Sequence, residues 1–239
     1  MNVTAKRFLC APLPLLICLI LICSSATAQR SPFKYIYSVD YPVGQKDAYL
    51  EWVRSIAGAL QANEEVARIL SYDNYFGSSP QRMVEFEFES MEAAARYFEL
   101  PKVNPVLDEV VARGVHGAMG VYKLRGDYTK GNEDVTAHYP IKYVISVDYP
   151  VGRKKDYLEW IGSIADYLQV SEHVERIASY DNYFGASPHR RIEFEFETMS
   201  DAAAYWSDPV IADILADVVN HGIDSGSEVF TLRSDYIKK

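Results

Sequence analysis

Two short segments of the sequence alternate glutamate with phenylalanine. Residues 85–89 are Glu-Phe-Glu-Phe-Glu, and residues 193–197 repeat the same pattern. A period of two is typical of a strand, so the carboxylates lie on one face and the rings on the other. Because the rings need a covering layer, we expect the carboxylates on the opposite, sheltered face. Clustered carboxylates repel one another and therefore need raised pKa values or cationic partners.

Two interpretations of this glutamate stripe are open. In the first, the carboxylates line an acidic pocket that supplies a general base or binds a cation. In the second, which we favour, they form cross-strand ion pairs with basic residues. The basic residues that recur at the same spacing in both halves of the chain are Lys34, Arg68, Arg125, Lys142, Arg176 and Arg233.

A second group of candidates combines aromatic, amide and carboxylate side chains. The run 71–77, Ser-Tyr-Asp-Asn-Tyr-Phe-Gly, recurs almost unchanged at 179–185. Its rings and amides can hold a planar polar ligand, or they can satisfy the backbone of a turn. The aspartate of Asp-Tyr-Pro-Val-Gly in each half is a candidate general base or a turn residue. The ligand-binding candidates are therefore Asp40, Tyr72, Asn74, Glu87, Asp148, Tyr180, Asn182 and Glu195, and no catalytic residue is assigned.

These candidates occur in pairs because the chain contains one module twice. The segment 34–44 recurs at 142–152, and the offset of 108 residues holds without a gap to the end of the second copy. A period this long indicates duplication of a whole small domain rather than a solenoid. We expect a first module at 29–128, a polar linker at 129–141 and a second module at 142–239.

Each module has the pattern β-α-β-β-α-β. In the first copy, hydrophobic periodicity and turn residues predict strands at 35–41, 67–76, 83–89 and 119–125, and helices at 46–62 and 91–113. Pro101 and Pro105 are expected to divide the second helix into two pieces. Ser90 is a plausible N-cap for that helix.

This order is the split βαβ, ferredoxin-like arrangement, in which both helices cover one face of an antiparallel sheet. Two such modules can bury their uncovered faces together, so we predict an α+β fold that forms a pseudo-dimeric α/β barrel within one chain. Over 34–128 and 142–236 the sequence resembles the dimeric α/β-barrel superfamily, which includes the antibiotic-biosynthesis-type monooxygenases. The resemblance rests on element order and duplication, and it implies a fold rather than an activity.

The first 28 residues have the features of a signal peptide. Lys6 and Arg7 precede an apolar run at 8–23, and the small residues of 26–28 predict cleavage before Gln29. All three cysteines lie in this segment, so the mature protein has no disulfide. Export without disulfides favours a bacterial periplasm or exterior. We expect no membrane association after cleavage.

Composition and motifs narrow the possible functions. The residues are 49% hydrophobic and 24% charged, as in globular proteins, and the net charge of −9 argues against nucleic-acid binding. The five histidines do not recur at the repeat offset, which argues against haem, and no metal or nucleotide motif is present. We therefore expect no cofactor.

Three functions remain open from the sequence. The first is an exported protein that binds an unidentified small molecule. The second is a cofactor-free monooxygenase- or isomerase-like enzyme acting on an aromatic or polyketide-like substrate. The third is a structural or interaction protein whose barrel is filled. The sequence does not decide whether the protein is an enzyme.

Overall fold

The computed structural model describes residues 30–61, 64–131 and 136–237, so the predicted signal peptide lies outside the described residues. The first half contains β1 (Phe33–Asp40), α1 (Lys46–Gln61), β2 (Arg68–Asn74), β3 (Arg82–Phe88), α2 (Met91–Glu99), α3 (Asn104–Arg113) and β4 (Val115–Thr129). The second half contains β5 (Ile141–Asp148), α4 (Lys154–Gln169), β6 (Arg176–Asn182), β7 (Arg190–Phe196), α5 (Met199–Ser207), α6 (Pro209–His221) and β8 (Ile223–Ile237).

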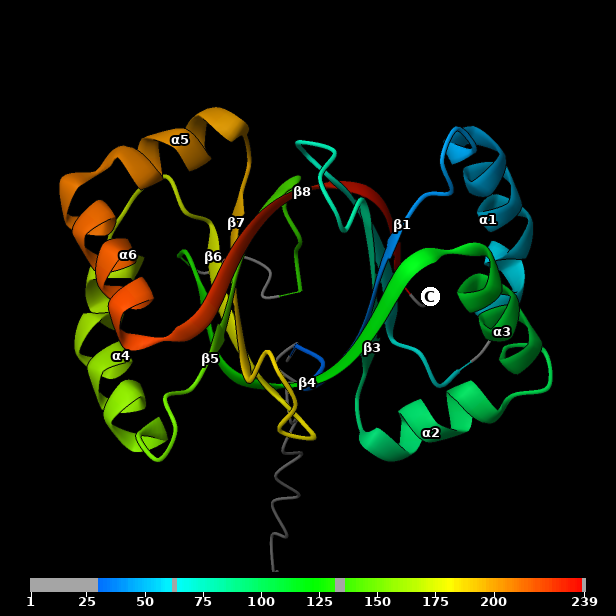
Figure 1. The fold of residues 1–239 in the computed structure, drawn as a ribbon, viewed down its shortest axis with the longest axis horizontal. Coiled ribbons are helices and arrows are strands. Elements are labelled where there is room, and N and C mark those ends of the chain that lie inside the picture. Colours follow the sequence, from blue (N-terminus) through cyan, green and yellow to red (C-terminus); the bar gives the residue numbers. More distant parts are fainter. Residues whose placement is uncertain (1–29, 62–63, 132–135, 238–239) are drawn as a thin grey trace, which may run out of the picture.

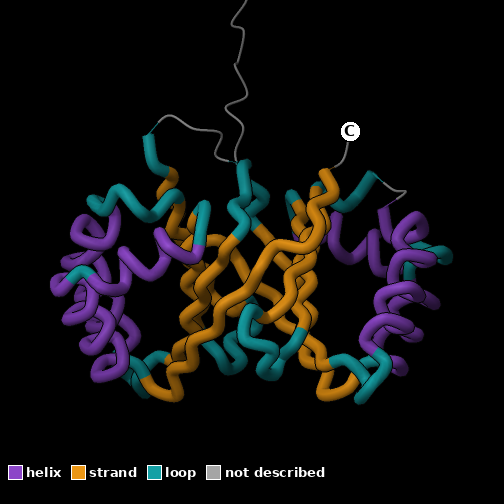
Figure 2. Tube along the Cα trace, turned by 90° about the horizontal axis from the view of Figure 1, so that it is seen from above, coloured by secondary structure: helices purple, strands orange, loops and turns teal. Residues whose placement is uncertain are grey.

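The strands form one closed antiparallel barrel in the order β1-β3-β2-β8-β5-β7-β6-β4. Helices α1, α2 and α3 cover one side of the barrel, and α4, α5 and α6 cover the opposite side (Figure 1). Viewed at right angles, the strands occupy the middle of the molecule between two helical layers (Figure 2). The predicted pseudo-dimeric α/β barrel is therefore confirmed. Within the described residues, no helix has the length and apolar character needed to cross a bilayer.

The two long strands close the barrel. The first part of β4 pairs with β1 of its own half, and its end, from Tyr122 to Thr129, pairs with β6 of the other half. Strand β8 pairs with β5 and then with β2 in the same manner. The predicted strand at 119–125 is thus the middle of a longer strand. Each half supplies the edge partner that the other half lacks.

The helix breaks follow from local chemistry. α2 ends at Glu99, and α3 begins at Asn104, next to Pro105, as the two prolines predict. The Oγ of Ser90 accepts a hydrogen bond from the backbone N of Ala93 at 3.1 Å, which confirms the predicted N-cap. In the second half, the Oδ1 of Asp208 caps α6 by accepting from the backbone N of Val210 at 2.8 Å.

The two faces of each sheet have different surroundings. Phe86 and Phe88 of β3 pack against Tyr97 of α2, with ring centroids 5.9 and 5.4 Å from the tyrosine ring. The glutamates that alternate with them face the barrel interior. This is the division of faces that the alternating pattern predicts.

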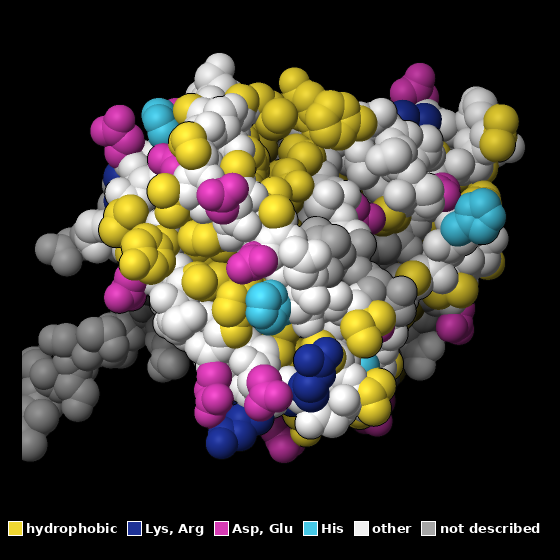
Figure 3. All heavy atoms as spheres, turned by 60° about the vertical axis from the view of Figure 1, so that its left-hand side comes forward, with side chains coloured by type: hydrophobic (Ala, Val, Ile, Leu, Met, Phe, Trp, Pro, Cys, Tyr) yellow, Lys and Arg dark blue, Asp and Glu magenta, His cyan; other side chains and the backbone are white. Residues whose placement is uncertain are grey.

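The outer surface is mixed in character. Charged and hydrophobic side chains are interspersed, with hydrophobic side chains gathered at the top of one view (Figure 3). Large apolar side chains are exposed at turns, including Val43 and Val151 after the first strand of each half, and also on helices and strands, including Val111 and Met119. Isolated exposed residues of this kind are common on soluble proteins.

Candidate functional site

The centre of the barrel holds four charged side chains with no exposed area. The Nζ of Lys34 lies 2.9 Å from Glu85 and 3.0 Å from Glu193. The Nζ of Lys142 lies 2.9 Å from Glu85 and 3.1 Å from Glu193. Each lysine therefore bridges the two halves, and the four charges balance. We call these residues the central tetrad.

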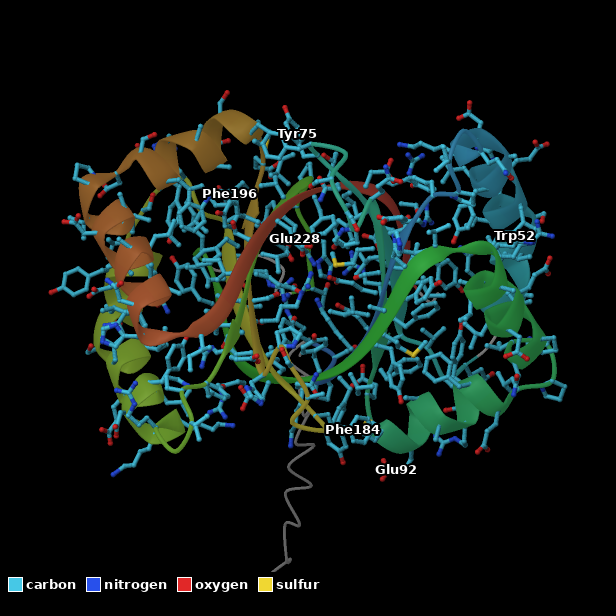
Figure 4. The ribbon with its side chains drawn as sticks, viewed as in Figure 1. Trp52, Tyr75, Glu92, Phe184, Phe196 and Glu228 are labelled. Carbon is cyan, nitrogen blue, oxygen red and sulfur yellow. The ribbon has the colours of Figure 1, made fainter. Side chains whose placement is uncertain are left out.

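Lys34 and Glu193 of the central tetrad remain ionised although they are buried. Burial disfavours the charge on Lys34, but Glu193 and Glu85 outweigh this effect and hold its pKa well above the ordinary value. Burial opposes the charge on Glu193 as well, but Lys142, Lys34 and Arg191 hold its pKa well below the ordinary value. Side chains fill the space enclosed by the strands (Figure 4).

A pair of tyrosines completes the centre of the barrel. The Nζ of Lys142 lies 4.4 Å from the ring centroid of Tyr72, and the Nζ of Lys34 lies 4.6 Å from that of Tyr180. Both hydroxyl groups are buried without a hydrogen-bond partner. Burial is the main cause that raises the pKa of both tyrosines. The contacts of these rings are thus with the lysines of the tetrad.

A histidine closes one end of the barrel. The Nδ1 of His138, in the segment between β4 and β5, lies 3.1 Å from Glu195, and its Nε2 lies 3.4 Å from Glu87. Burial lowers the pKa of His138, but the two carboxylates outweigh burial and raise it. Burial opposes the charge on Glu87, and the contact with His138 is the main cause that lowers its pKa to about 2. A cavity of about 160 Å³ at this end of the barrel is lined by Glu87, His138 and Arg68.

The interior is therefore an ion-pair network, as the favoured interpretation of the glutamate stripe predicts. Lys34, Lys142 and Arg176 pair with the stripe, Arg176 with Glu195 at 3.4 Å. The prediction was wrong for the other three basic residues. Arg68 pairs with Asp235, Arg125 with Asp181 and Arg233 with Asp73.

Two β-bulges explain these errors. The register of β4 shifts between Leu124 and Gly126, which leaves Arg125 as the extra residue of the bulge. The register of β8 against β2 shifts in the same way around Arg233. An extra residue reverses the alternation of faces beyond it. Asp127 consequently faces the interior and pairs with Arg176 at 3.2 Å.

The remaining candidates lie at the turns. The Oδ1 of Asn74 accepts a hydrogen bond from the backbone N of Phe76 at 3.0 Å, and Asn182 makes the matching bond in the second half. Asp40 accepts from the Oγ of Ser79 at 2.8 Å, and Asp148 accepts from a serine at 2.7 Å. These side chains hold the hairpin turns against the end of the first strand. Tyr72 lies at the centre of the barrel, Asn74 at a turn and Glu87 at one end of the barrel. These three side chains therefore do not converge on one site.

Asp40 also borders a surface groove of about 390 Å³. His116, whose backbone φ is 53°, lies in this groove with its Nδ1 3.1 Å from the Oδ2 of Asp40. The His116 side chain is 78% exposed. Because the groove is open and the oxygens of Asp40 already accept from Ser79, His116 and the backbone N of Gln81, it offers little shelter for a ligand.

A different cavity lies between the helices and the sheet of the first half. Its volume is about 110 Å³, comparable to an engineered apolar cavity of about 150 Å³ that binds benzene. Its lining is mostly apolar and includes Val53 of α1, Val84 and Phe86 of β3 and Leu107 of α3. Val111 of α3, also in the lining, is 57% exposed, which places an edge of the cavity at the surface.

The matching cavity of the second half is nearly closed, with a volume of about 20 Å³. Sequence differences at the repeat offset explain the contrast. Where the first half has Val53, Val84 and Phe98, the second half has Ile161, Ile192 and Trp206, and these larger side chains line what remains of the space. The duplicated fold is the same, but only the first half retains a cavity of ligand size.

A few polar groups line the first cavity. The hydroxyl of Tyr37 donates a long bond of 3.4 Å to the carbonyl of Val110, and burial raises the pKa of Tyr37 to about 12. The Oγ atoms of Ser71 and Ser234 are 2.8 Å apart, so the second half contributes to the wall. Arg82 also lines the cavity.

The neighbourhood of Tyr37 is specific to the first half. A Cβ atom at Gly117 would lie 2.9 Å from the Tyr37 hydroxyl oxygen, and one at Gly114 would lie 2.8 Å from it. The second half has Ile145 in place of Tyr37 and Ser225 in place of Gly117. Gly117 and the Tyr37 hydroxyl therefore occur together in the first half. The absence of a side chain at position 117 leaves room for this hydroxyl.

None of the eight ligand-binding candidates lines this cavity, and whether any of them contacts a ligand stays a prediction. Several residues of this cavity differ between the two copies, so identities between the copies do not reveal them. The informative signal is the set of differences, where the first copy has the smaller apolar residue or the hydroxyl.

The described residues that line the cavity include no histidine or cysteine, so no imidazole or thiolate is placed there to ligate a haem iron. Within the described part of the chain, no group of three or more histidine, cysteine, aspartate or glutamate side chains could hold a metal ion.

No protein-family model matches the sequence, and no curated protein matches it. Solved structures are similar in fold. An anthrone oxidase-like protein superposes with a TM-score of 0.67 at 8% identity, covering 88% of this chain and 95% of that chain. A candidate monooxygenase from Lactobacillus acidophilus gives 0.60 at 11% identity, covering 87% and 96%. A chlorite dismutase from Candidatus Nitrospira defluvii gives 0.54 at 11% identity, covering 86% and 92%.

These similarities establish the architecture. The chain has the fold of the dimeric α/β-barrel superfamily, with both ferredoxin-like halves in one polypeptide. The three proteins carry different descriptions on this fold. Activity must therefore be argued from the site itself.

Proposed function

We propose that this protein is exported and binds a small, largely apolar molecule in the cavity of the first half. The observation that carries this proposal is the asymmetry between the duplicated halves, with about 110 Å³ open in one and about 20 Å³ in the other. Ligand sites are typically apolar clefts with a few polar groups that fix orientation. The cavity has this composition, whereas the barrel interior is filled by paired charges.

Binding is favoured over the alternative of a cofactor-free monooxygenase or isomerase. Among the described lining residues there is no carboxylate and no imidazole. Acid–base catalysis needs a group whose pKa lies near the working pH, and the pKa of the Tyr37 hydroxyl is about 12. The lining is thus suited to holding a molecule rather than to moving its protons.

Export is supported by the sequence of the first 28 residues. Lys6 and Arg7, the apolar run at 8–23 and the small residues of 26–28 have the order of a cleaved signal peptide. We propose a periplasmic or secreted location for a mature chain that begins at Gln29.

One experiment tests binding and export together. Native mass spectrometry of the protein purified from its own host should give the mass of residues 29–239 plus one ligand per chain. The variant Val53→Ile/Val84→Ile/Phe98→Trp, which introduces the residues of the second half, should lose the ligand, with affinity reduced at least about tenfold, or about 1.4 kcal/mol.

A matched control changes the other half. Ile161→Val/Ile192→Val/Trp206→Phe enlarges the second cavity and leaves the first untouched, so its ligand should remain bound. Retention of the ligand by the filled variant, with an unchanged circular dichroism spectrum, would place the binding site elsewhere. A chain that carries no ligand and binds none would contradict the proposed function.

A further inference from the structure

We infer that Arg82 is the receptor for a single oxyanion, such as a carboxylate, on a ligand with a body the size of one aromatic ring. This inference rests on the proposed function and specifies the ligand class. Arg82 begins β3, faces the helices and lines the cavity of the first half. Its side chain is buried, with only 4% of the residue exposed.

The guanidinium group of Arg82 interacts with the hydroxyl of Tyr41, but it is not fully partnered. Its Nη1 is buried and has no hydrogen bond. In the described part of the chain, no ion pair joins Arg82 to a carboxylate. A buried charge is costly unless it is paired. A planar guanidinium with a vacant donor beside an apolar cavity is suited to an oxyanion, because its donors match the oxygens of a carboxylate.

The carboxylate opposite Arg82 on the neighbouring strand already has other partners. Asp73 is the register partner of Arg82 on β2. It is ion-paired with Arg233, lies 3.6 Å from the Nζ of Lys46, and accepts a hydrogen bond of 2.7 Å from the hydroxyl of Tyr41. Two cations, Arg233 and Lys46, therefore already pair with Asp73, and within the described residues no ion pair joins it to Arg82. The charge of Arg82 is left without a carboxylate, which favours an anionic ligand.

The size of the cavity limits the rest of the ligand. A volume of about 110 Å³ is in the range that accommodates a benzene ring. The apolar wall leaves room for few other polar substituents. The chemical class is therefore a small aryl or short aliphatic oxyanion.

The second half provides an internal control for this inference. Arg190 is the equivalent residue, and it is buried to the same degree, with unpartnered nitrogen atoms. Its guanidinium lies 5.8 Å from the ring centroid of Tyr157. The cavity of the second half, of about 20 Å³, is lined by apolar side chains and not by Arg190. A purely structural role of the arginine would be shared by both positions, whereas an oxyanion-binding role belongs to Arg82 alone.

The test compares three probes of one size at pH 7 by ligand-observed NMR titration of the mature chain. Benzoate carries the oxyanion. Benzamide is its neutral isostere, and toluene has neither the oxyanion nor the amide. We expect benzoate to bind at least tenfold more tightly than benzamide. Arg82→Gln should abolish this preference, Arg82→Lys should reduce it, and Arg190→Gln should leave it unchanged.

The outcomes separate the inference from the proposed function. Equal binding of benzoate and benzamide, or a preference that survives in Arg82→Gln, would overturn the role of Arg82 while leaving a cavity that binds apolar molecules. If Arg82→Gln does not fold, the wild-type preference and the Arg82→Lys variant decide the question. Absence of binding by all three probes would overturn the inference, and the ligand carried from the host would then decide the proposed function independently.

Discussion

Lys34 and Lys142 share two glutamates at the centre of the barrel, and none of these side chains reaches solvent. Such a network is stable only as a unit. Removing one partner leaves a buried charge without compensation, whereas replacing a whole pair by neutral groups costs much less. The central tetrad therefore couples the two halves, because no single member can be removed without leaving a buried charge uncompensated.

This argument predicts the effect of Lys34→Met. The variant leaves Glu85 and Glu193 with one shared lysine, so the free energy of unfolding should fall by about 3–5 kcal/mol. The double variant Lys34→Met/Glu193→Gln removes one charge of each sign and should be more stable than the single variant. Urea denaturation followed by circular dichroism measures both.

A surface lysine is the matched control. Lys46 on α1 has a side chain that is 53% exposed, and it lies 3.6 Å from Asp73. Because exposed ion pairs contribute little, Lys46→Met should cost less than about 1 kcal/mol. A loss of similar size for Lys34→Met and Lys46→Met would contradict the role assigned to the central tetrad.

At the residue scale, the sequence predicts which face of a strand a side chain occupies better than it predicts the ion-pair partner of that side chain. Strict alternation was enough to place Glu85 and Glu87 inside the barrel and Phe86 outside it. It could not identify Asp127 as a partner of Arg176, because that pairing depends on the bulge at Arg125, where the alternation changes. Arg82 was missed for a related reason. A basic residue that starts a strand has no local signal for burial.

At the scale of elements, the helices that cover the two cavities differ in how firmly they are held. Helix α3 has no fully buried residue, and its N-cap, Val103, provides no side-chain hydrogen bond. Helix α6 is capped by Asp208 and buries Ile211 and Val218. Fewer buried contacts and a missing cap lower the free energy of local opening. α3 is therefore the element through which a ligand would enter.

Hydrogen exchange tests this difference. Backbone amides of 104–113 should exchange faster than those of 209–221 in the same sample, as measured by mass spectrometry of proteolytic peptides. The comparison is internal, because both helices occupy equivalent positions in the duplicated fold. Slower or equal exchange in α3 would show that the cavity opens elsewhere or does not open.

The order and kinds of elements could be predicted from the sequence, because helices and strands are encoded by local periodicity. The lengths of β4 and β8 could not. Gly117 and Gly126 weaken the strand pattern of β4 on the two sides of the predicted segment. The additional residues extend as a strand because β1 and β6 bond to them. Strand ends that depend on distant partners leave no local pattern.

At the scale of the whole molecule, the barrel makes the two halves mutually dependent. Strand β2 of the first half is paired with β8 of the second, and β4 is paired with β6. Ser234 of β8 forms part of the cavity wall in the first half. The ligand site therefore needs both halves, although only one half supplies most of its lining.

This dependence predicts the behaviour of residues 29–130 expressed alone. Two strands would lose their partners, and Lys34 would lose its contact with Glu193, so this fragment should unfold or self-associate. Light scattering coupled to size-exclusion chromatography, together with thermal melting, measures both effects against the full mature chain. Co-expression with residues 131–239 should restore a one-to-one complex. A stable, folded monomer of the first half would contradict the shared barrel, because its sheet would then have to shelter the charges of Lys34 and Glu85 without the second half.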